Sequence, residues 1–183
     1  MGLPAGLPVA TPDGWCEAGA LQSGDRVWCV DGPPQRVVRC VPAYLSQRWG
    51  VQVPSGVLGN SDAVVLFAAQ SVALELDQAA VIYGDPVALV PAGALVGWRG
   101  IGRVWLAGMP VVKVWFARPQ VVYAQPGVLL GCAGDAASVL DTHGPPAPPL
   151  TAEQARHLMA CVMAQEAGSG LRPYAALDAG KRA

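Results

Sequence analysis

The stretch Gly6-Leu7-Pro8-Val9-Ala10-Thr11-Pro12-Asp13-Gly14, followed by Ser23-Gly24-Asp25-Arg26-Val27, sets the fold class of this chain. Its first part predicts a short strand that ends in a Pro-Asp-Gly turn, because these residue types favour turn conformations. Its second part predicts a Ser-Gly-Asp turn that begins another strand, with the Asp25 carboxylate accepting hydrogen bonds from backbone amides of the turn. Two strands and two tight turns in so short a stretch indicate a β-rich fold.

Short apolar or alternating segments recur along the chain and are separated by turn residues. Strands are predicted at residues 27–30, 35–41, 51–53, 63–67, 72–76, 80–83, 87–90, 111–116 and 120–124. The 22 glycines and 17 prolines fall mainly between these segments, which is typical of turns that join short strands. The pattern predicts an all-β fold rather than alternating βαβ units.

The composition is that of one apolar domain. A length of 183 residues suits a single domain, and 52% of the residues are hydrophobic while only 14% are charged. A net charge of −1 without a basic cluster argues against nucleic-acid binding. The longest charge-free run, residues 119–134, is interrupted by Gln, Pro and Gly, so no membrane span is expected. The composition does not exclude a protein partner, but it does not identify one.

The cysteines stand at wide spacings and form no C-x-x-C pair, which argues against a disulfide framework and a zinc site. They are expected to be buried free thiols that pack as small hydrophobes: Cys16, Cys29, Cys40, Cys132 and Cys161. No metal and no cofactor are expected. Since the N-terminus lacks a basic region followed by an apolar core, no secretory signal is expected either, and a cytoplasmic location is favoured.

The last part of the chain differs in kind from the rest. Residues 143–150 are expected to be a Pro-rich linker, because Pro145-Pro146-Ala147-Pro148-Pro149 favours an extended chain. Thr151 and Gln154 have the spacing of a capping box, which predicts a helix at residues 152–166. The expected organisation is therefore a β-domain (1–142), the linker, a helical segment (151–167) and a disordered tail (168–183).

Several segments resemble, in order, parts of hedgehog/intein (Hint) domains, particularly bacterial Hint-type modules. They cover roughly residues 2–160, and they are the opening stretch, Val51-Gln52-Val53-Pro54-Ser55-Gly56-Val57-Leu58-Gly59, Leu89-Val90-Pro91-Ala92-Gly93-Ala94-Leu95, Val114-Trp115-Phe116-Ala117-Arg118-Pro119-Gln120-Val121-Val122 and Gln125-Pro126-Gly127. The resemblance implies an all-β, Hint-like horseshoe of about ten to twelve short strands, here with an added C-terminal helix.

The resemblance also implies protein self-processing. In the family, a thiol or hydroxyl at the first position attacks the preceding carbonyl, and a Thr-x-x-His or Ser-x-x-His segment protonates the departing nitrogen. Gly2 matches the nucleophile, Ala68 and Ser71 match the hydroxyl and the imidazole, and Pro119 matches a late histidine. These four residues are expected around one cleft, as a degenerate site that contains no catalytic residue.

Three functions stay open on this basis. The leading hypothesis is a Hint-type module that no longer processes itself and is retained as a binding or accessory domain. The second is an active self-cleaving domain with an unorthodox nucleophile such as Ser71 or Cys16. The third is an unrelated small β-domain that binds carbohydrate or peptide.

Other chemistry-bearing residues have simpler structural interpretations. His143 and His157 are expected to face solvent, and Glu75 and Asp77 are expected on a solvated strand face. The six tryptophans are expected to fill the core rather than to form a stacking surface: Trp15, Trp28, Trp49, Trp98, Trp105 and Trp115.

Overall fold

The computed structural model describes residues 2–46, 48–135 and 149–168. Within these ranges the chain forms thirteen strands, two α-helices and three 3-10 helices. The strands are β1 (Leu3–Pro4), β2 (Pro8–Thr11), β3 (Gly14–Glu17), β4 (Arg26–Val27), β5 (Gln35–Leu45), β6 (Arg48–Val53), β7 (Val64–Phe67), β8 (Ser71–Glu75), β9 (Val87–Pro91), β10 (Gly102–Leu106), β11 (Met109–Phe116), β12 (Gln120–Ala124) and β13 (Val128–Gly134). The helices are η1 (Ala18–Ala20), α1 (Asp77–Tyr83), η2 (Ala92–Leu95), η3 (Trp98–Gly100) and α2 (Ala152–Gly168).

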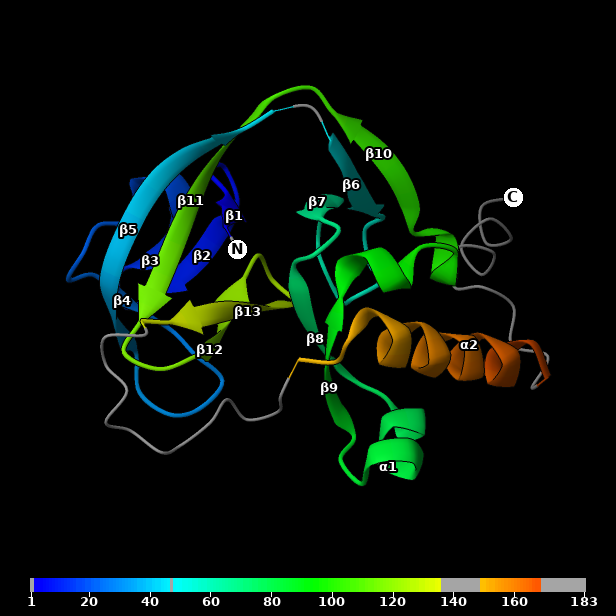
Figure 1. Ribbon diagram of the computed structural model, residues 1–183. Helices are drawn as coiled ribbons and strands as arrows, with labels where there is room; N and C mark the ends of the chain where they lie inside the picture. The colour runs from blue at the N-terminus through cyan, green and yellow to red at the C-terminus, as the bar shows by residue number, and fades with distance from the viewer. Residues whose placement is uncertain (1, 47, 136–148, 169–183) are drawn as a thin grey trace, which may run out of the picture.

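The strands form two sheets that curve into a horseshoe (Figure 1). The larger sheet has the order β3-β2-β12-β13-β11-β5-β4, with β1 added to β11, β8 to β13, and β9 to β8. The smaller sheet has the order β10-β6-β7. The long antiparallel pair of β5 and β11 leads directly into the pair of β6 and β10 and so joins the two sheets. The predicted all-β horseshoe is confirmed, with thirteen strands among the described residues where about ten to twelve were expected.

The opening stretch folds as its turn residues predict. β2 and β3 pair as a hairpin around the Pro-Asp-Gly turn, in which Gly14 has a φ of 115° that favours glycine. In the Ser-Gly-Asp turn, the Gln22 amide donates to Asp25 Oδ2 at 2.8 Å. Asp25 is therefore the structural turn carboxylate that the sequence predicts. β4 then pairs with β5, which confirms the second hairpin, and β5 extends to Leu45. The predicted strand at residues 27–30 is wrong beyond Val27, because β4 ends there and Cys29 instead forms an isolated bridge to Val122.

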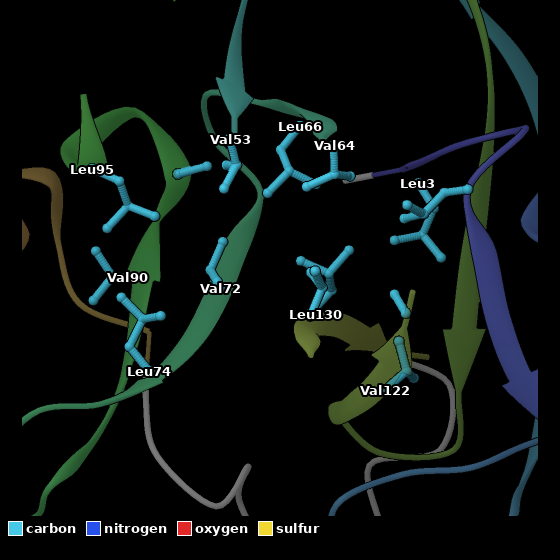
Figure 2. Close-up of a cluster of buried hydrophobic side chains, with 14 of the residues drawn as sticks. Leu3, Val53, Val64, Leu66, Val72, Leu74, Val90, Leu95, Val122 and Leu130 are labelled. Carbon is cyan, nitrogen blue, oxygen red and sulfur yellow. The ribbon is translucent and has the colours of Figure 1, made fainter. Parts of the chain in front are cut away.

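One hydrophobic core runs through both sheets (Figure 2). Side chains from the smaller sheet, including Val53 and Leu66, and from the larger sheet, including Leu3 and Leu130, belong to one buried cluster. Fully burying each such side chain contributes about 1.5–3 kcal/mol. This shared core therefore holds the two sheets in place relative to each other. Strands β8, β12 and β13 belong to the larger sheet.

The C-terminal helix packs onto the same core. Its capping box is present, since the Thr151 amide donates to Gln154 Oε1 at 2.9 Å and the Gln154 amide donates to Thr151 Oγ1 at 3.2 Å. The buried face of α2 includes Leu158 and Met159. Near the end of α2, Glu166 accepts hydrogen bonds from Arg99 Nη2 at 2.8 Å and from the indole N–H of Trp98 at 3.1 Å.

The predicted strand at residues 80–83 is wrong. Residues 80–83 lie in α1, because Asp77 provides an acidic first turn, alanines follow, and Gly84 ends the helix in the left-handed conformation with a φ of 80°. Asp77 therefore begins a helix and does not share a strand face with Glu75. Four strands that were not predicted complete the sheets: β1, β3, β10 and β13.

The tryptophans were expected in the core, and for four of them this is wrong. Trp15, Trp28, Trp49 and Trp105 are 41–57% exposed, and of the six only Trp98 is buried, at 5% exposure. Exposed Trp49 and Trp105 face each other across β6 and β10, where their rings pack edge to face with centroids 5.0 Å apart. Cross-strand aromatic pairs of this kind stabilise a sheet even when the rings are not buried in the core.

All five cysteines are free, as predicted. The expectation that they are buried is right for Cys29 and wrong for the other four, which are only partly buried. His143, residues 143–148 of the linker and residues 169–183 of the tail lie outside the described residues. Among the helices of the described residues, none has the length and apolar character needed to cross a membrane.

Candidate functional site

A cavity of about 300 Å³ lies where the ends of β8, β12 and β13 meet. We call it the Ser71–Pro119 cavity, because these two residues stand in its wall although they are far apart in sequence. The described residues that line it are Ser71, Leu89, Pro119, Gln120, Gly131, Cys132, Ala133, Gly134 and Pro149.

Two glycines of β13 bring Ser71 and Pro119 into one wall. A Cβ atom at Gly131 would lie 3.0 Å from the Ser71 Cβ, and a Cβ atom at Gly134 would lie 2.7 Å from the Pro119 Cδ. Ordinary carbon–carbon contacts are about 3.5–4.0 Å long. Only residues without a side chain therefore allow β13 to pack this closely against both Ser71 and Pro119.

Gln70 fastens the turn between β7 and β8 to β13. Its side chain is 1% exposed and donates from Nε2 to the Gly131 carbonyl at 2.9 Å. Its backbone carbonyl accepts a hydrogen bond from the Ala92 amide at 2.8 Å. These bonds hold Ser71, the next residue, at the edge of the cavity.

The polar groups of the cavity are uncharged. The described lining residues include the Ser71 hydroxyl, the Gln120 carboxamide and the Cys132 thiol, and none of them is acidic or basic. Burial raises the pKa of Cys132 to about 12, so this cysteine is a neutral thiol at pH 7. Gln120 is 3% exposed, and its Oε1 has no hydrogen-bond partner among the described residues.

Gly2 and Ala68 do not line this cavity. Gly2 lies beside β11, where a Cβ atom would be 3.0 Å from the Val112 carbonyl oxygen. Ala68 is an exposed residue of the turn between β7 and β8, and its carbonyl accepts a hydrogen bond from the Gly93 amide at 2.7 Å. The structure thus brings Ser71 and Pro119 together, whereas Gly2 precedes β1 and Ala68 lies in the turn after β7, outside the described lining of the cavity.

Cys16 and His157 lie on other parts of the molecule. Cys16 is on β3, at the end of the larger sheet, and its thiol donates to the Glu17 carbonyl at 3.4 Å. His157 is on the exposed face of α2, with Nε2 3.9 Å from the Cys161 thiol. In the part of the chain that the structure describes, no group of three or more His, Cys, Asp or Glu side chains is placed to hold a metal ion.

Comparison with known families decides the classification. A family model described as the Hint domain matches residues 1–128 of this chain. This match includes β1 to β12 and thus most of the strands that form the horseshoe. The chain belongs to the Hint domain family. The alternative of an unrelated small β-domain is therefore wrong.

Solved structures that are similar to this chain include inteins and an intein-like domain. The intein-like domain from Clostridium thermocellum has a TM-score of 0.51 at 12% identity and covers 71% of this chain and 97% of its own. The MchDnaB-1 intein has a TM-score of 0.45 at 21% identity and covers 71% of this chain and 98% of its own. The TvoVMA intein has a TM-score of 0.48 at 12% identity, with 71% and 96% covered. A search of curated proteins found no match.

The sequence did not indicate three features of the Ser71–Pro119 cavity. They are the unpartnered Gln120 oxygen, the Cys132 thiol in the wall, and the close packing of β13 against Ser71 and Pro119. Gln120 follows Pro119 directly, but nothing local indicates that its carboxamide is buried without a partner for Oε1. Cys132 resembles any other wide-spaced cysteine. The one available signal was the pair Gly131 and Gly134 inside an otherwise apolar strand, since glycine in a strand marks a close approach of another part of the chain.

Proposed function

We propose that this Hint domain does not process itself and that it serves as a binding domain through the Ser71–Pro119 cavity. The observation that carries the proposal is the chemistry of the cavity wall. Ser71 and Pro119, which match family histidines, stand together there without an imidazole, beside groups that are neutral at pH 7. The two positions that match the family's histidines thus line a preformed cavity and carry no imidazole.

The position of Gly2 supports the loss of the nucleophile. An acyl shift requires a thiol or hydroxyl at this position to form an ester or thioester, and hydrogen is the only side chain here. A new side chain at Gly2 would first meet the Val112 carbonyl oxygen at 3.0 Å, a contact that requires a shift of a few tenths of an ångström. The site is therefore narrow but can admit a small residue.

The surroundings of Ser71 support the loss of the general acid. A positioned acid or base contributes about 10²–10⁴-fold to a reaction rate. No hydrogen bond joins the Ser71 hydroxyl to a histidine among the described residues, where His157 is the only histidine and lies on the exposed face of α2. A departing amide nitrogen at this place would have no imidazolium to protonate it.

The alternative of an unorthodox nucleophile has less support. Cys16 lies at the end of the larger sheet, away from the cavity that contains Ser71. Cys132 does line the cavity, but its raised pKa of about 12 keeps it protonated, and the thiolate is the reactive form. Ser71 is buried and lacks a described base beside it.

Restoring the missing groups tests this proposal. A reporter protein is fused ahead of Gly2, and cleavage at the junction is followed by gel and mass spectrometry with and without dithiothreitol. We expect Gly2→Cys alone to give little cleavage, because no imidazole is present. We expect the triple variant Gly2→Cys, Ala68→Thr, Ser71→His to recover thiol-induced cleavage.

A matched control separates processing from general thiol chemistry. Gly6→Cys places a thiol on a nearby glycine where a Cβ atom meets nothing within 4 Å among the described residues. Combined with Ala68→Thr and Ser71→His, this variant should remain intact. Equal cleavage of the Gly6→Cys and Gly2→Cys triple variants would refute the assignment of Gly2 to the nucleophile position.

A further inference from the structure

The outer face of the larger sheet, on the side away from the main core, carries three exposed aromatic side chains close together. Trp15 on β3 is paired with Ala10 on β2, and the Ala10 carbonyl accepts a hydrogen bond from the Trp28 amide at 2.9 Å. The Trp28 carbonyl in turn accepts a hydrogen bond from the Tyr123 amide of β12 at 3.2 Å. Each of the three aromatic residues is followed by a residue that packs in or against the main core. Because successive side chains of an extended chain point to opposite faces, the three rings lie on the outer face.

A small apolar cluster continues this face across β8, β9, β12 and β13. The cluster is separate from the main core and contains Ala73, Leu89, Val121 and the partly buried Leu129. Leu129 is the partner of Tyr123 where β12 pairs with β13. The three aromatic rings and the cluster therefore form one continuous surface, which we call the outer apolar face.

None of the described elements covers the aromatic side chains of the outer apolar face. Trp15 is 53% exposed, and Trp28, Val30 and Tyr123 are each 41% exposed. Contiguous exposed apolar patches on folded proteins mark interaction surfaces, and Trp and Tyr supply a large share of the binding energy in protein interfaces. The composition of this face is thus that of the centre of a protein interface.

A cavity of about 360 Å³ at one end of the outer apolar face has acidic groups in its lining. Val121 and Leu129 of the apolar cluster form part of its wall. Its described lining contains no Lys or Arg but has three exposed carboxylates: Asp31, Glu75 and Asp85. Neither of the two ion pairs found among the described residues involves these carboxylates. The cavity therefore attracts a cation, and its apolar wall suits the methylene stem of a Lys or Arg side chain.

We propose that the outer apolar face binds an extended segment of a protein partner that carries a Lys or Arg two residues from an aromatic residue. The spacing comes from β12, because Tyr123 and Val121 point to the same face and are about 6.8 Å apart along the strand. A partner ring that lies against Tyr123 and Trp28 thus places the side chain two positions away at the acidic cavity. The described linings of this cavity and of the Ser71–Pro119 cavity have no residue in common. The inference therefore goes beyond the proposed function and can fail separately from it.

An NMR titration of the unmodified, isotope-labelled protein tests the inference. The probe is the peptide acetyl-Gly-Trp-Gly-Arg-Gly-amide, and the matched control peptide has citrulline, a neutral analogue of similar shape, in place of arginine. We expect saturable chemical-shift changes that include the Trp28 indole N–H, and binding of the citrulline peptide that is weaker by about threefold or more. In about 1 M salt, where the Debye length is about 3 Å, the difference between the two peptides should shrink.

A second control peptide, acetyl-Gly-Trp-Arg-Gly-Gly-amide, tests the spacing. Adjacent side chains of an extended chain point to opposite sides, so this peptide cannot place its ring and its cation on the face together. Its binding should be weaker than that of the probe by about threefold or more. An affinity equal to that of the probe for either control peptide, or the absence of saturable binding of the probe, would overturn the proposal.

Variants of exposed side chains identify the surface that binds the peptide. Trp28→Ser should weaken binding of both the arginine and the citrulline peptide by about threefold or more, because it removes a ring from the face. Glu75→Gln should weaken binding of the arginine peptide alone, by about twofold or more. The matched controls are Trp49→Ser on the smaller sheet and Glu153→Gln on α2, which are also exposed and should bind both peptides normally. Unchanged affinity in Trp28→Ser or in Glu75→Gln would overturn the proposal.

Two other occupants of the outer apolar face would give different results with the same variants. A dimer in sedimentation that Trp28→Ser converts to a monomer would assign the face to a second copy of this chain and overturn the proposal. Binding to phosphatidylcholine vesicles that Trp28→Ser abolishes, without binding of the peptide, would assign the face to a membrane and overturn it as well.

Discussion

Replacing Gly134 by alanine tests how tightly β13 packs against the turn before β12. A Cβ atom there would lie 2.7 Å from the Pro119 Cδ, 2.8 Å from the Pro119 nitrogen and 2.9 Å from the Arg118 carbonyl carbon. Because relaxed carbon–carbon contacts are about 3.5–4.0 Å long, the new methyl group is about 1 Å too close. Two of the three atoms belong to the backbone, so no side-chain rotation relieves the overlap.

We expect Gly134→Ala to lower the free energy of unfolding by about 1–3 kcal/mol, the usual cost of overpacking. For a chain of this size each kcal/mol lowers Tm by roughly 2–4 °C. Urea unfolding monitored by circular dichroism measures the change directly. The matched control is Gly102→Ala on β10, where a Cβ atom meets nothing within 4 Å among the described residues. This control should be neutral or stabilised by up to about 1 kcal/mol, because alanine restricts the unfolded chain. Equal stability of the two variants would refute the close approach of β13 to Pro119.

Three further predictions concern backbone strain, helix capping and thiol ionisation. Arg99 has a φ of 45°, so Arg99→Gly should be more stable than Arg99→Ala by about 1 kcal/mol in urea unfolding, and the reverse order would contradict the strain. Gln154→Ala removes the acceptor for the Thr151 amide and should destabilise the protein by about 0.5–1.5 kcal/mol, whereas no change in Tm would show that the capping box is dispensable. Burial raises the pKa of Cys29 from 9.0 to about 12, so the unfolded chain loses this proton first and stability should fall as the pH rises from about 9 to about 12. In Cys29→Ala, the fall in stability between about pH 9 and about pH 12 should be smaller, because this titrating thiol is absent.

The features that the sequence predicts correctly are those encoded by neighbouring residues. The turn at Asp25 and the capping box at Thr151 and Gln154 depend on contacts within three positions along the chain. Residues 80–83 were assigned to a strand because a short apolar run does not distinguish helix from strand. The helix forms there because Asp77 and Gly84 provide its beginning and its end.

The candidate site could be predicted only in part. The resemblance pointed to Ser71 and Pro119, and the structure places both in one cavity wall. The cavity itself arises from the close approach of Gly131 and Gly134 to these residues, a contact between segments that are distant in sequence. The unpartnered Gln120 oxygen is likewise a consequence of tertiary packing, and no local pattern reports it.

The intact mass of the unmodified reporter fusion, measured over days at neutral pH with hydroxylamine, tests the central claim most directly. Hydroxylamine cleaves any ester or thioester formed at the junction, so it detects an acyl shift even when the later steps are absent. Under the proposal, Gly2 supplies no nucleophile to form this bond and Ser71 supplies no imidazole to release it, so we predict that the fusion remains at its full mass. Cleavage at the Gly2 junction of the unmodified fusion would contradict the account and show that this chain contains an active nucleophile.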